Sequence, residues 1–356
     1  MSPYENSKPS SFWKMSIANK SAFEIDEIYS KRFEISFEDK IATAGSCFAQ
    51  NIQKYLKLSS YNLYEVEKAP LNLPKDLHAS FGYSLFSARY GNIYTVAQLL
   101  QLILRSLSKQ KITNNIWRKD NRYYDAFRPN IEPLGFKNEN ELIESRMFHL
   151  SSVKKLFSNM DILVFTLGLT ETWINKKDGT VYPIAPGIIA GKFDVNEYEF
   201  KNFSFDEIYK DFLKVRETIK KIRDPQKKPT KFILTVSPVP LTATASDKHV
   251  LVASTYSKSL LRAVAGELYK NFDDVDYFPS FEIITNPASR GIFYDSNLRT
   301  VNVHGVETAM KSFFSEHQSN KDSSKLIEGE IFTEENKKML AKIDNVCEEQ
   351  VIEDNL

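Results

Sequence analysis

The chain has little of several residue types that would commit it to a particular class of protein. Only two cysteines, Cys47 and Cys347, occur among its 356 residues, too few for a disulfide framework or a four-cysteine zinc site. No apolar run approaches the roughly 20 residues of a membrane-spanning helix. The first residues lack the charged and apolar regions of a secretory signal. These absences predict a cytoplasmic protein without a transmembrane segment.

Charge and motif patterns remove further classes. The net charge is +1 at pH 7, so we expect no general attraction to nucleic acid. Twelve glycines occur, but none forms a dinucleotide-binding or P-loop pattern, and no two histidines stand at metal-ligand spacing. We therefore expect no nucleic-acid partner, no metal and no bound cofactor. The apolar content of 42% and charged content of 26% are ordinary for a globular protein.

Apolar runs alternate with helical patterns along most of the chain. Short apolar runs at 41–44, 161–167 and 231–236 are typical of strands covered on both faces. Helical periodicity follows each of them. This alternation predicts an α/β fold of three layers, with a mainly parallel sheet between helices. We also expect an interrupted last strand at 275–284, an inserted hairpin within 110–135, and a long irregular region at 174–203.

Composition divides the chain into three parts. Residues 1–36 read as a polar arm with scattered aromatics, residues 37–316 as the folded domain, and residues 317–356 as a charged tail. The tail holds one amphipathic segment with Phe332, Met339, Leu340, Ile343 and Val346. It is either a helix that packs back or contacts a partner, or a partly disordered end.

The stretch at 41–51 has the pattern of a strand, a tight turn and a helix. Gly45 ends the apolar run, Ser46 follows, and Phe48 begins a helical repeat. Such a turn presents a hydroxyl at the carboxyl end of a sheet, beside the N–H groups of a helix start. The alternative is that Ser46 only caps the helix. Cys47 is a second candidate nucleophile, although buried cysteine usually behaves as a small apolar residue.

Residues 45–49, Gly-Ser-Cys-Phe-Ala, resemble the signature of the GSCFA family, which looks like a branch of the SGNH (GDSL-like) hydrolases and acyltransferases. The resemblance extends to further stretches, at 90–95, 126–129, 165–173, 235–241 and 256–259. It implies an SGNH or flavodoxin-like fold, with Ser46 as the nucleophile. It also implies an oxyanion hole from Gly91, with Asn92 beside it, and from Gly168. Thr170 stands where the resemblance to SGNH enzymes implies an asparagine, and a threonine hydroxyl can still donate one hydrogen bond.

The general base is the point at which the sequence departs from the pattern that the resemblance implies. SGNH enzymes use a late histidine with an aspartate three residues before it, but Val301 stands three residues before His304. An ungapped match places Asn297 and Thr300 at those two positions. His304 and His249 both remain candidates for the base. Glu171, directly after a strand, is a candidate to orient an imidazole.

The resemblance implies a serine esterase or O-acyltransferase that acts on acylated sugars in bacterial surface or capsule polysaccharide biosynthesis. Acyl transfer would pass through a seryl ester, with water or a sugar hydroxyl as acceptor, and acyl-CoA is a conceivable co-substrate. The first alternative is a non-catalytic module that binds a glycan or acyl-CoA through a degenerate site. The second is an interaction protein that contacts a partner through 318–356. The sequence leaves the acyl group, the acceptor and the oligomeric state open.

Overall fold

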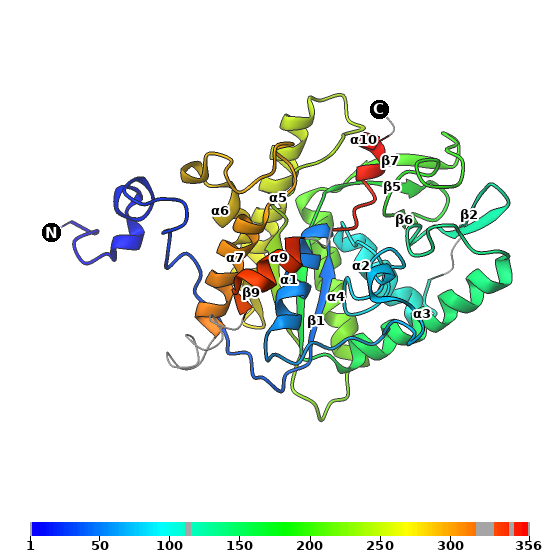
Figure 1. The fold of residues 1–356 in the computed structure, drawn as a ribbon, viewed down its shortest axis with the longest axis horizontal. Coiled ribbons are helices and arrows are strands. Elements are labelled where there is room, and N and C mark those ends of the chain that lie inside the picture. Colours follow the sequence, from blue (N-terminus) through cyan, green and yellow to red (C-terminus); the bar gives the residue numbers. More distant parts are fainter. Residues whose placement is uncertain (1, 111–114, 318–330, 342–344, 355–356) are drawn as a thin grey trace.

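The computed structural model describes residues 2–110, 115–317, 331–341 and 345–354, and Figure 1 shows their arrangement. The strands of the described residues are β1 (Ile41–Gly45), β2 (Ile116–Lys119), β3 (Arg122–Asp125), β4 (Ile162–Leu167), β5 (Glu171–Asn175), β6 (Val181–Tyr182), β7 (Tyr198–Asn202), β8 (Lys231–Val236) and β9 (Val275–Tyr277). The helices are α1 (Cys47–Leu58), α2 (Val96–Ser106), α3 (Glu139–Asn159), α4 (Phe205–Ile222), α5 (Val250–Asn271), α6 (Ser280–Thr285), α7 (Val303–His317), α9 (Glu334–Ala341) and α10 (Gln350–Asp354).

The central sheet has four strands in the order β1-β4-β8-β9, and every pair of neighbours is parallel. Gly45 pairs with Thr166, and Thr166 pairs with Thr235. The carboxyl ends of three strands therefore lie side by side. Ligands of parallel sheets bind at this edge.

Side chains of the central strands alternate between two apolar cores. On β4, Val164 lies in one core while Leu163 and Phe165 lie in the other, as the two-residue period of a strand requires. One core is shared with α1, α6 and α7, and the other with α2, α3, α4 and α5. The sheet thus lies between two helical layers, as Figure 1 shows, and the predicted three-layer α/β architecture is confirmed.

The inserted hairpin is confirmed as β2 and β3, which pair in antiparallel fashion. Its turn residues Asp120 and Asn121 have φ of 49° and 59°, a left-handed conformation that Asp and Asn tolerate better than most residues.

Two regions differ from the prediction. The stretch at 174–203, expected to be irregular, contains most of a three-stranded antiparallel sheet in the order β6-β5-β7. Its strands are only two to five residues long, so their period is weak in the sequence. The expected last strand at 275–284 is β9 followed by the helix α6, because a short apolar run such as 281–284 fits a buried helix as well as a strand.

The two ends of the chain pack against the domain in different ways. The arm begins with short helical turns, and its later residues Ala22, Tyr29 and Ile35 enter the core beside α7. The predicted amphipathic tail segment is α9 in part, and Ile343 lies outside the described residues. Figure 1 shows the last described segment passing over the start of α1 toward β5 and β7.

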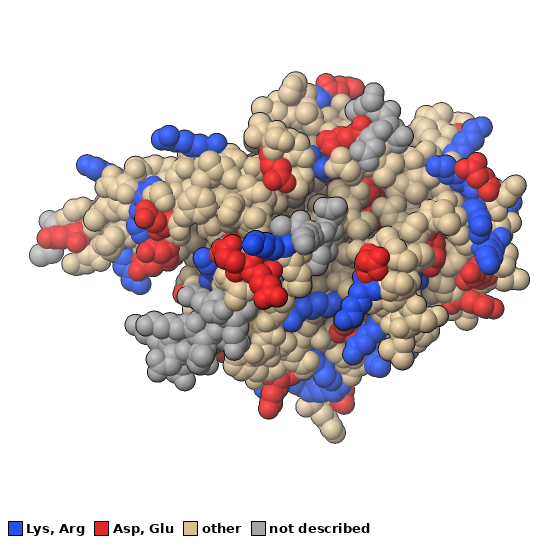
Figure 2. All heavy atoms as spheres, in the orientation of Figure 1, with Lys and Arg blue, Asp and Glu red and all other residues tan. Residues whose placement is uncertain are grey.

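The described surface carries charges of both signs. Figure 2 shows Lys and Arg interspersed with Asp and Glu over one face of the molecule, consistent with the small net charge. Among the described helices, none combines the length and apolarity that crossing a bilayer requires.

Candidate active site

Ser46 lies between the end of β1 and the first residue of α1, at the carboxyl edge of the sheet. It is only 2% exposed, and its Oγ has no hydrogen-bond partner among the described residues. Although Ser46 occupies the N-cap position of α1, its side chain makes no capping hydrogen bond. Capping therefore does not account for this hydroxyl. It is left free beside a helix start, whose N–H groups lack intrahelical acceptors and carry partial positive charge.

Two glycines allow the chain to approach Ser46 closely. Gly45 has φ of 136°, and a Cβ built there would lie 2.5 Å from the Thr166 carbonyl oxygen. A Cβ on Gly168, just after β4, would lie 3.0 Å from Ser46 Cβ and 3.0 Å from the Tyr94 carbonyl oxygen. The local backbone therefore requires glycine at position 45, while a side chain at position 168 would force its neighbours to move by a few tenths of an ångström.

The loop that carries Gly91 and Asn92 reaches the same edge. The Ile93 N–H donates to the Gly45 carbonyl over 2.8 Å, which ties this loop to the end of β1. Gly91 adopts φ of 69°, and Asn92 is 1% exposed. The structure thus places the loop of Gly91 and Asn92 at the same edge of the sheet as Ser46 and Gly168, and their roles in an oxyanion hole stay a prediction.

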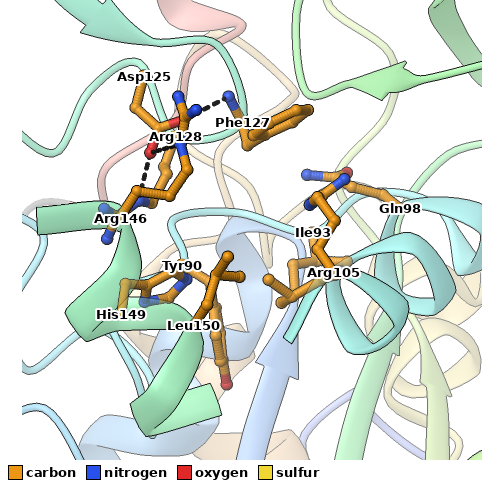
Figure 3. A pocket seen from close by; sticks show the side chains of 11 residues that line it. Tyr90, Ile93, Gln98, Arg105, Asp125, Phe127, Arg128, Arg146, His149 and Leu150 are labelled. Atoms are coloured by element: carbon orange, nitrogen blue, oxygen red, sulfur yellow. Dashed lines mark hydrogen bonds and ion pairs between the residues drawn. The ribbon is translucent and has the colours of Figure 1, made fainter. Parts of the chain in front are cut away.

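A buried ion cluster supports this loop from behind. Arg128 donates to the Arg89 carbonyl over 3.1 Å and to Asp125 Oδ2 over 2.9 Å, and Arg146 Nη2 donates to Asp125 Oδ1 over 2.9 Å. Figure 3 shows the two guanidinium groups converging on Asp125. The arginines hold the pKa of Asp125 below its usual range despite complete burial. Arg128, within the stretch at 126–129, therefore holds the loop that carries Gly91 and Asn92 in place.

The pocket of Figure 3 is small. Its cavity volume is about 20 Å³, room for about one water molecule. Arg105 and His149 both line this cavity. Arg105 Nη1 and His149 Nε2 are buried and have no hydrogen-bond partner in the described chain. A bridging water would satisfy both atoms, so we assign this cavity to the structural support of the loop.

Thr170 and Glu171 follow Gly168 on the same side of the sheet. Thr170 Oγ1 is buried and has no partner among the described residues, while the Thr170 N–H donates to Ser257 Oγ over 3.1 Å. Glu171 accepts hydrogen bonds of 3.0 and 2.9 Å from Thr244 Oγ1, and partial burial raises its pKa. The partner of this carboxylate is thus a hydroxyl rather than an imidazole.

Neither candidate histidine hydrogen bonds to Ser46. His249 is exposed at the N-cap of α5, where its Nδ1 accepts from the Leu251 N–H over 3.2 Å. His304 is exposed on α7 and packs edge-on against Phe23 of the arm, with ring centroids 6.5 Å apart. The ring of His249 therefore serves as a helix cap, and the ring of His304 makes a surface contact with the arm.

Asn297 and Thr300 reproduce the local contact of an aspartate and a histidine three residues apart. Asn297 Nδ2 donates to Thr300 Oγ1 over 2.9 Å, and the Thr300 N–H donates to Asn297 Oδ1 over 2.9 Å. An amide and a hydroxyl stand in this pair, so it offers no imidazole as a base.

The family model of the GSCFA family matches residues 40–313 of the chain. This chain belongs to the GSCFA family. The match spans every candidate site residue named so far, from Ser46 at the turn after β1 to His304 on α7. No curated protein matches the chain.

Lys258 is a buried basic residue of the GSCFA domain that the sequence reasoning missed. It lies on α5, is 4% exposed, and its Nζ donates to the Gly168 carbonyl over 2.8 Å. Burial lowers its pKa to about 8. A signal was present in the sequence, because Lys258 falls on the buried face of α5 at helical spacing from Leu261 and Ala265.

The C-terminal segment, residues 345–349, lies outside the GSCFA match yet fills this edge of the domain. Asn92 Nδ2 donates to the Val346 carbonyl over 2.8 Å and also to Glu348 Oε2. Arg299 Nη2 donates to Glu349 Oε2 over 3.1 Å. Burial raises the pKa of both Glu348 and Glu349, and the positive charges of Arg299 and Lys258 oppose this rise at Glu349. One carboxyl group of the tail thus contacts Asn92, a residue predicted to bind substrate, and the other contacts Arg299, which the sequence did not single out.

Proposed function

We propose that the protein is a serine-dependent O-acyl hydrolase or acyltransferase of the SGNH type, and that its substrates are acylated sugars. The observation that carries the proposal is the buried, unpartnered hydroxyl of Ser46 at a strand-to-helix turn. A buried hydroxyl that neither caps a helix nor bonds to a described residue calls for an explanation, and a reaction with substrate supplies one. The family resemblance supports a role in bacterial surface polysaccharide biosynthesis. Both cysteines are free thiols, which fits the reducing cytoplasm.

In the proposed reaction Ser46 Oγ attacks the carbonyl carbon of an ester. The seryl ester forms as the bond to the departing alcohol breaks, and water or a sugar hydroxyl then takes the acyl group. The N–H groups at the start of α1 and in the Gly91 loop are the proposed donors for the oxyanion, and the Asn92 amide joins them once Val346 and Glu348 release it. Each of these donors stands at the carboxyl edge of the sheet beside the turn.

We assign Lys258 as the group that accepts the Ser46 proton. A neutral amine is a competent base near its own pKa, and that of Lys258 is about 8. Lys258 Nζ donates to the Gly168 carbonyl, and a Cβ built on Gly168 would lie 3.0 Å from Ser46 Cβ, so Lys258 and Ser46 both adjoin the same residue. The proton passes from Ser46 to Lys258 and then to the departing alkoxide.

A second candidate function is a non-catalytic module that binds a glycan or an acyl-CoA. The observation in its favour is the absence of an imidazole among the described contacts of Ser46, together with Asn297 and Thr300 in the places of the aspartate and histidine. A module of this kind would still bind its ligand beside Ser46, but no base would activate the Ser46 hydroxyl.

Reaction with a fluorophosphonate probe separates the two functions. We expect covalent labelling of the full chain on the tryptic peptide 41–54, at Ser46, because an activated serine attacks phosphorus as it attacks an ester. Ser46→Ala should abolish labelling. Ser59→Ala, at the other end of α1, is the matched control and should leave labelling unchanged. Labelling at another residue, or none, would favour the binding module.

The pH dependence of this labelling tests Lys258. The reactive form of the base is the neutral amine, so the labelling rate should rise with pH through about 8 and level off above it. Lys258→Met should lower the plateau and remove the rise. A rate that is constant between pH 6 and 9, or an unchanged profile in Lys258→Met, would show that Lys258 takes no proton from Ser46.

A further inference from the structure

The C-terminal segment is bound through its backbone by one glutamine of α1. Gln50 Nε2 donates to the Val346 carbonyl over 2.7 Å, and the Val346 N–H donates to Gln50 Oε1 over 3.0 Å. Lys54 Nζ donates to Asn345 Oδ1 over 2.9 Å. These contacts place the segment across the start of α1, the helix that begins directly after Ser46.

The two carboxyl groups of the segment occupy two different sets of donors. Glu348 Oε2 accepts from Asn92 Nδ2 and, over 2.7 Å, from the Tyr94 hydroxyl. Glu349 pairs with Arg299. The receiving residues are nearly fully buried, with Asn92 1%, Tyr94 3% and Arg299 7% exposed. The carboxylates therefore lie in a polar site that the folded domain itself provides.

Arg299 has donor capacity that the segment does not use. Arg299 Nη2 donates to Glu349 Oε2 and, over 3.9 Å, to Cys347 Sγ, while Arg299 Nε is buried without a partner in the described parts of the chain. A guanidinium binds a carboxylate best through two parallel N–H groups, and Nε with Nη2 is one such pair. The site can thus hold a carboxylate more completely than the tail's Glu349 fills it.

The burial of Arg299 decides the chemical class of anything that displaces the tail. If a neutral ligand replaced the segment, Arg299 would be left as an unpaired buried charge, which is strongly unfavourable. An anionic ligand avoids this cost because it replaces the Glu349 carboxylate with its own. The same argument excludes a simple neutral acylated sugar as the best occupant.

We propose that Arg299, together with Asn92 and Tyr94, forms a carboxylate subsite for an acidic saccharide, and that the C-terminal segment occupies this subsite in cis until such a ligand displaces it. The saccharide part of this inference rests on the proposed function. The segment is then a built-in competitor of the substrate. Its glutamates take the places of the substrate's carboxylate and of an oxygen held by Asn92 and Tyr94.

Binding of glucuronate and of glucose, which differ by one carboxylate, tests the subsite on the full chain by titration calorimetry. Glucuronate should bind at least about 10-fold more tightly than glucose, and Arg299→Leu should reduce its affinity to that of glucose. The double variant Glu348→Ala, Glu349→Ala removes the competitor and should tighten glucuronate binding about 10-fold. Glu353→Ala, a tail carboxylate outside the site, is the matched control and should change nothing.

A second variant keeps the test valid if the double variant is unstable. Val346→Pro removes the N–H that donates to Gln50 while keeping both glutamates, and it should also tighten glucuronate binding. Equal affinities for the two sugars in the tail variants would overturn the subsite. Unchanged glucuronate affinity in both tail variants would overturn the competition. An outcome in which a peptide of sequence Asn-Val-Cys-Glu-Glu binds the tail variants while glucuronate does not would identify a peptide site instead.

Failure of the subsite and failure of the proposed reaction can be told apart. Labelling of Ser46 with no preference for glucuronate would leave the acyl chemistry standing and remove the subsite. A preference for glucuronate without labelling of Ser46 would leave a site for acidic sugars on a protein that is no enzyme.

Discussion

Replacing Ser46 with alanine should lower kcat/KM for the hydrolysis of an O-acetylated sugar by about 10³-fold or more, about 4 kcal/mol of transition-state stabilisation. The variant loses the atom that forms the seryl ester, and no other described hydroxyl occupies the turn after β1. Its fold should be intact, because Ser46 Oγ bonds to no described residue. We therefore expect the free energy of unfolding to change by less than about 1 kcal/mol.

The neighbouring thiol supplies the control for this experiment. Cys47 is buried and its pKa is raised well above its usual value by the hydrogen bond with Cys347 and by burial, so it is a poor nucleophile. Cys47→Ala should keep most of the activity that Ser46→Ala loses. A loss of activity confined to Cys47→Ala would show that the thiol is the nucleophile. Full activity in both variants would show that neither side chain is the nucleophile.

Replacing Asp125 with leucine should destabilise the protein by about 3–5 kcal/mol, measured by urea unfolding. Asp125 is fully buried and accepts from both Arg128 and Arg146. Without it, two largely buried guanidinium groups lose their partner, and removal of one member of a buried pair costs about this much. The Gly91 loop, which Arg128 holds through the Arg89 carbonyl, should lose order as well, so labelling of Ser46 should fall with stability.

The matched control for Asp125 is an exposed ion pair. Glu217 and Lys221 on α4 have side chains 70% and 72% exposed, and an exposed pair of this kind contributes at most about 0.5 kcal/mol. Glu217→Leu should therefore leave the unfolding curve nearly unchanged. Similar losses for Asp125→Leu and Glu217→Leu would contradict a structural role for the cluster.

Local patterns predicted the parts of the fold that depend on near neighbours. The run at 41–44, the glycine after it and the helical repeat from Phe48 suffice to place Ser46 at the end of β1, because the strand, turn and helix are consecutive. The parallel sheet followed from alternation alone. The small sheet of β5, β6 and β7 did not, since its pairing depends on loops that bring short strands together.

The parts of the site that the sequence did not predict are distant from Ser46 along the chain. Glu348 meets Asn92 across 256 positions, and a charged terminal stretch ordinarily indicates solvent exposure. Arg299 was likewise unassigned, since a charged residue in a polar stretch gives no sign of burial. For the histidines, the sequence suggested a role that the structure does not support with a contact. His249 and His304 were candidates for the base, but His249 caps α5 and His304 packs against Phe23 of the arm.

The central claim is that Ser46 forms a seryl ester, and trapping this intermediate tests it most directly. The full chain is mixed with p-nitrophenyl acetate, quenched in acid during the burst, and digested with trypsin for peptide mass spectrometry. We predict one acetyl group on the peptide 41–54, at Ser46, that is stable to neutral hydroxylamine, whereas a thioester at Cys47 would be cleaved. An unmodified peptide 41–54, or an acetyl group only on Cys47, would contradict the account.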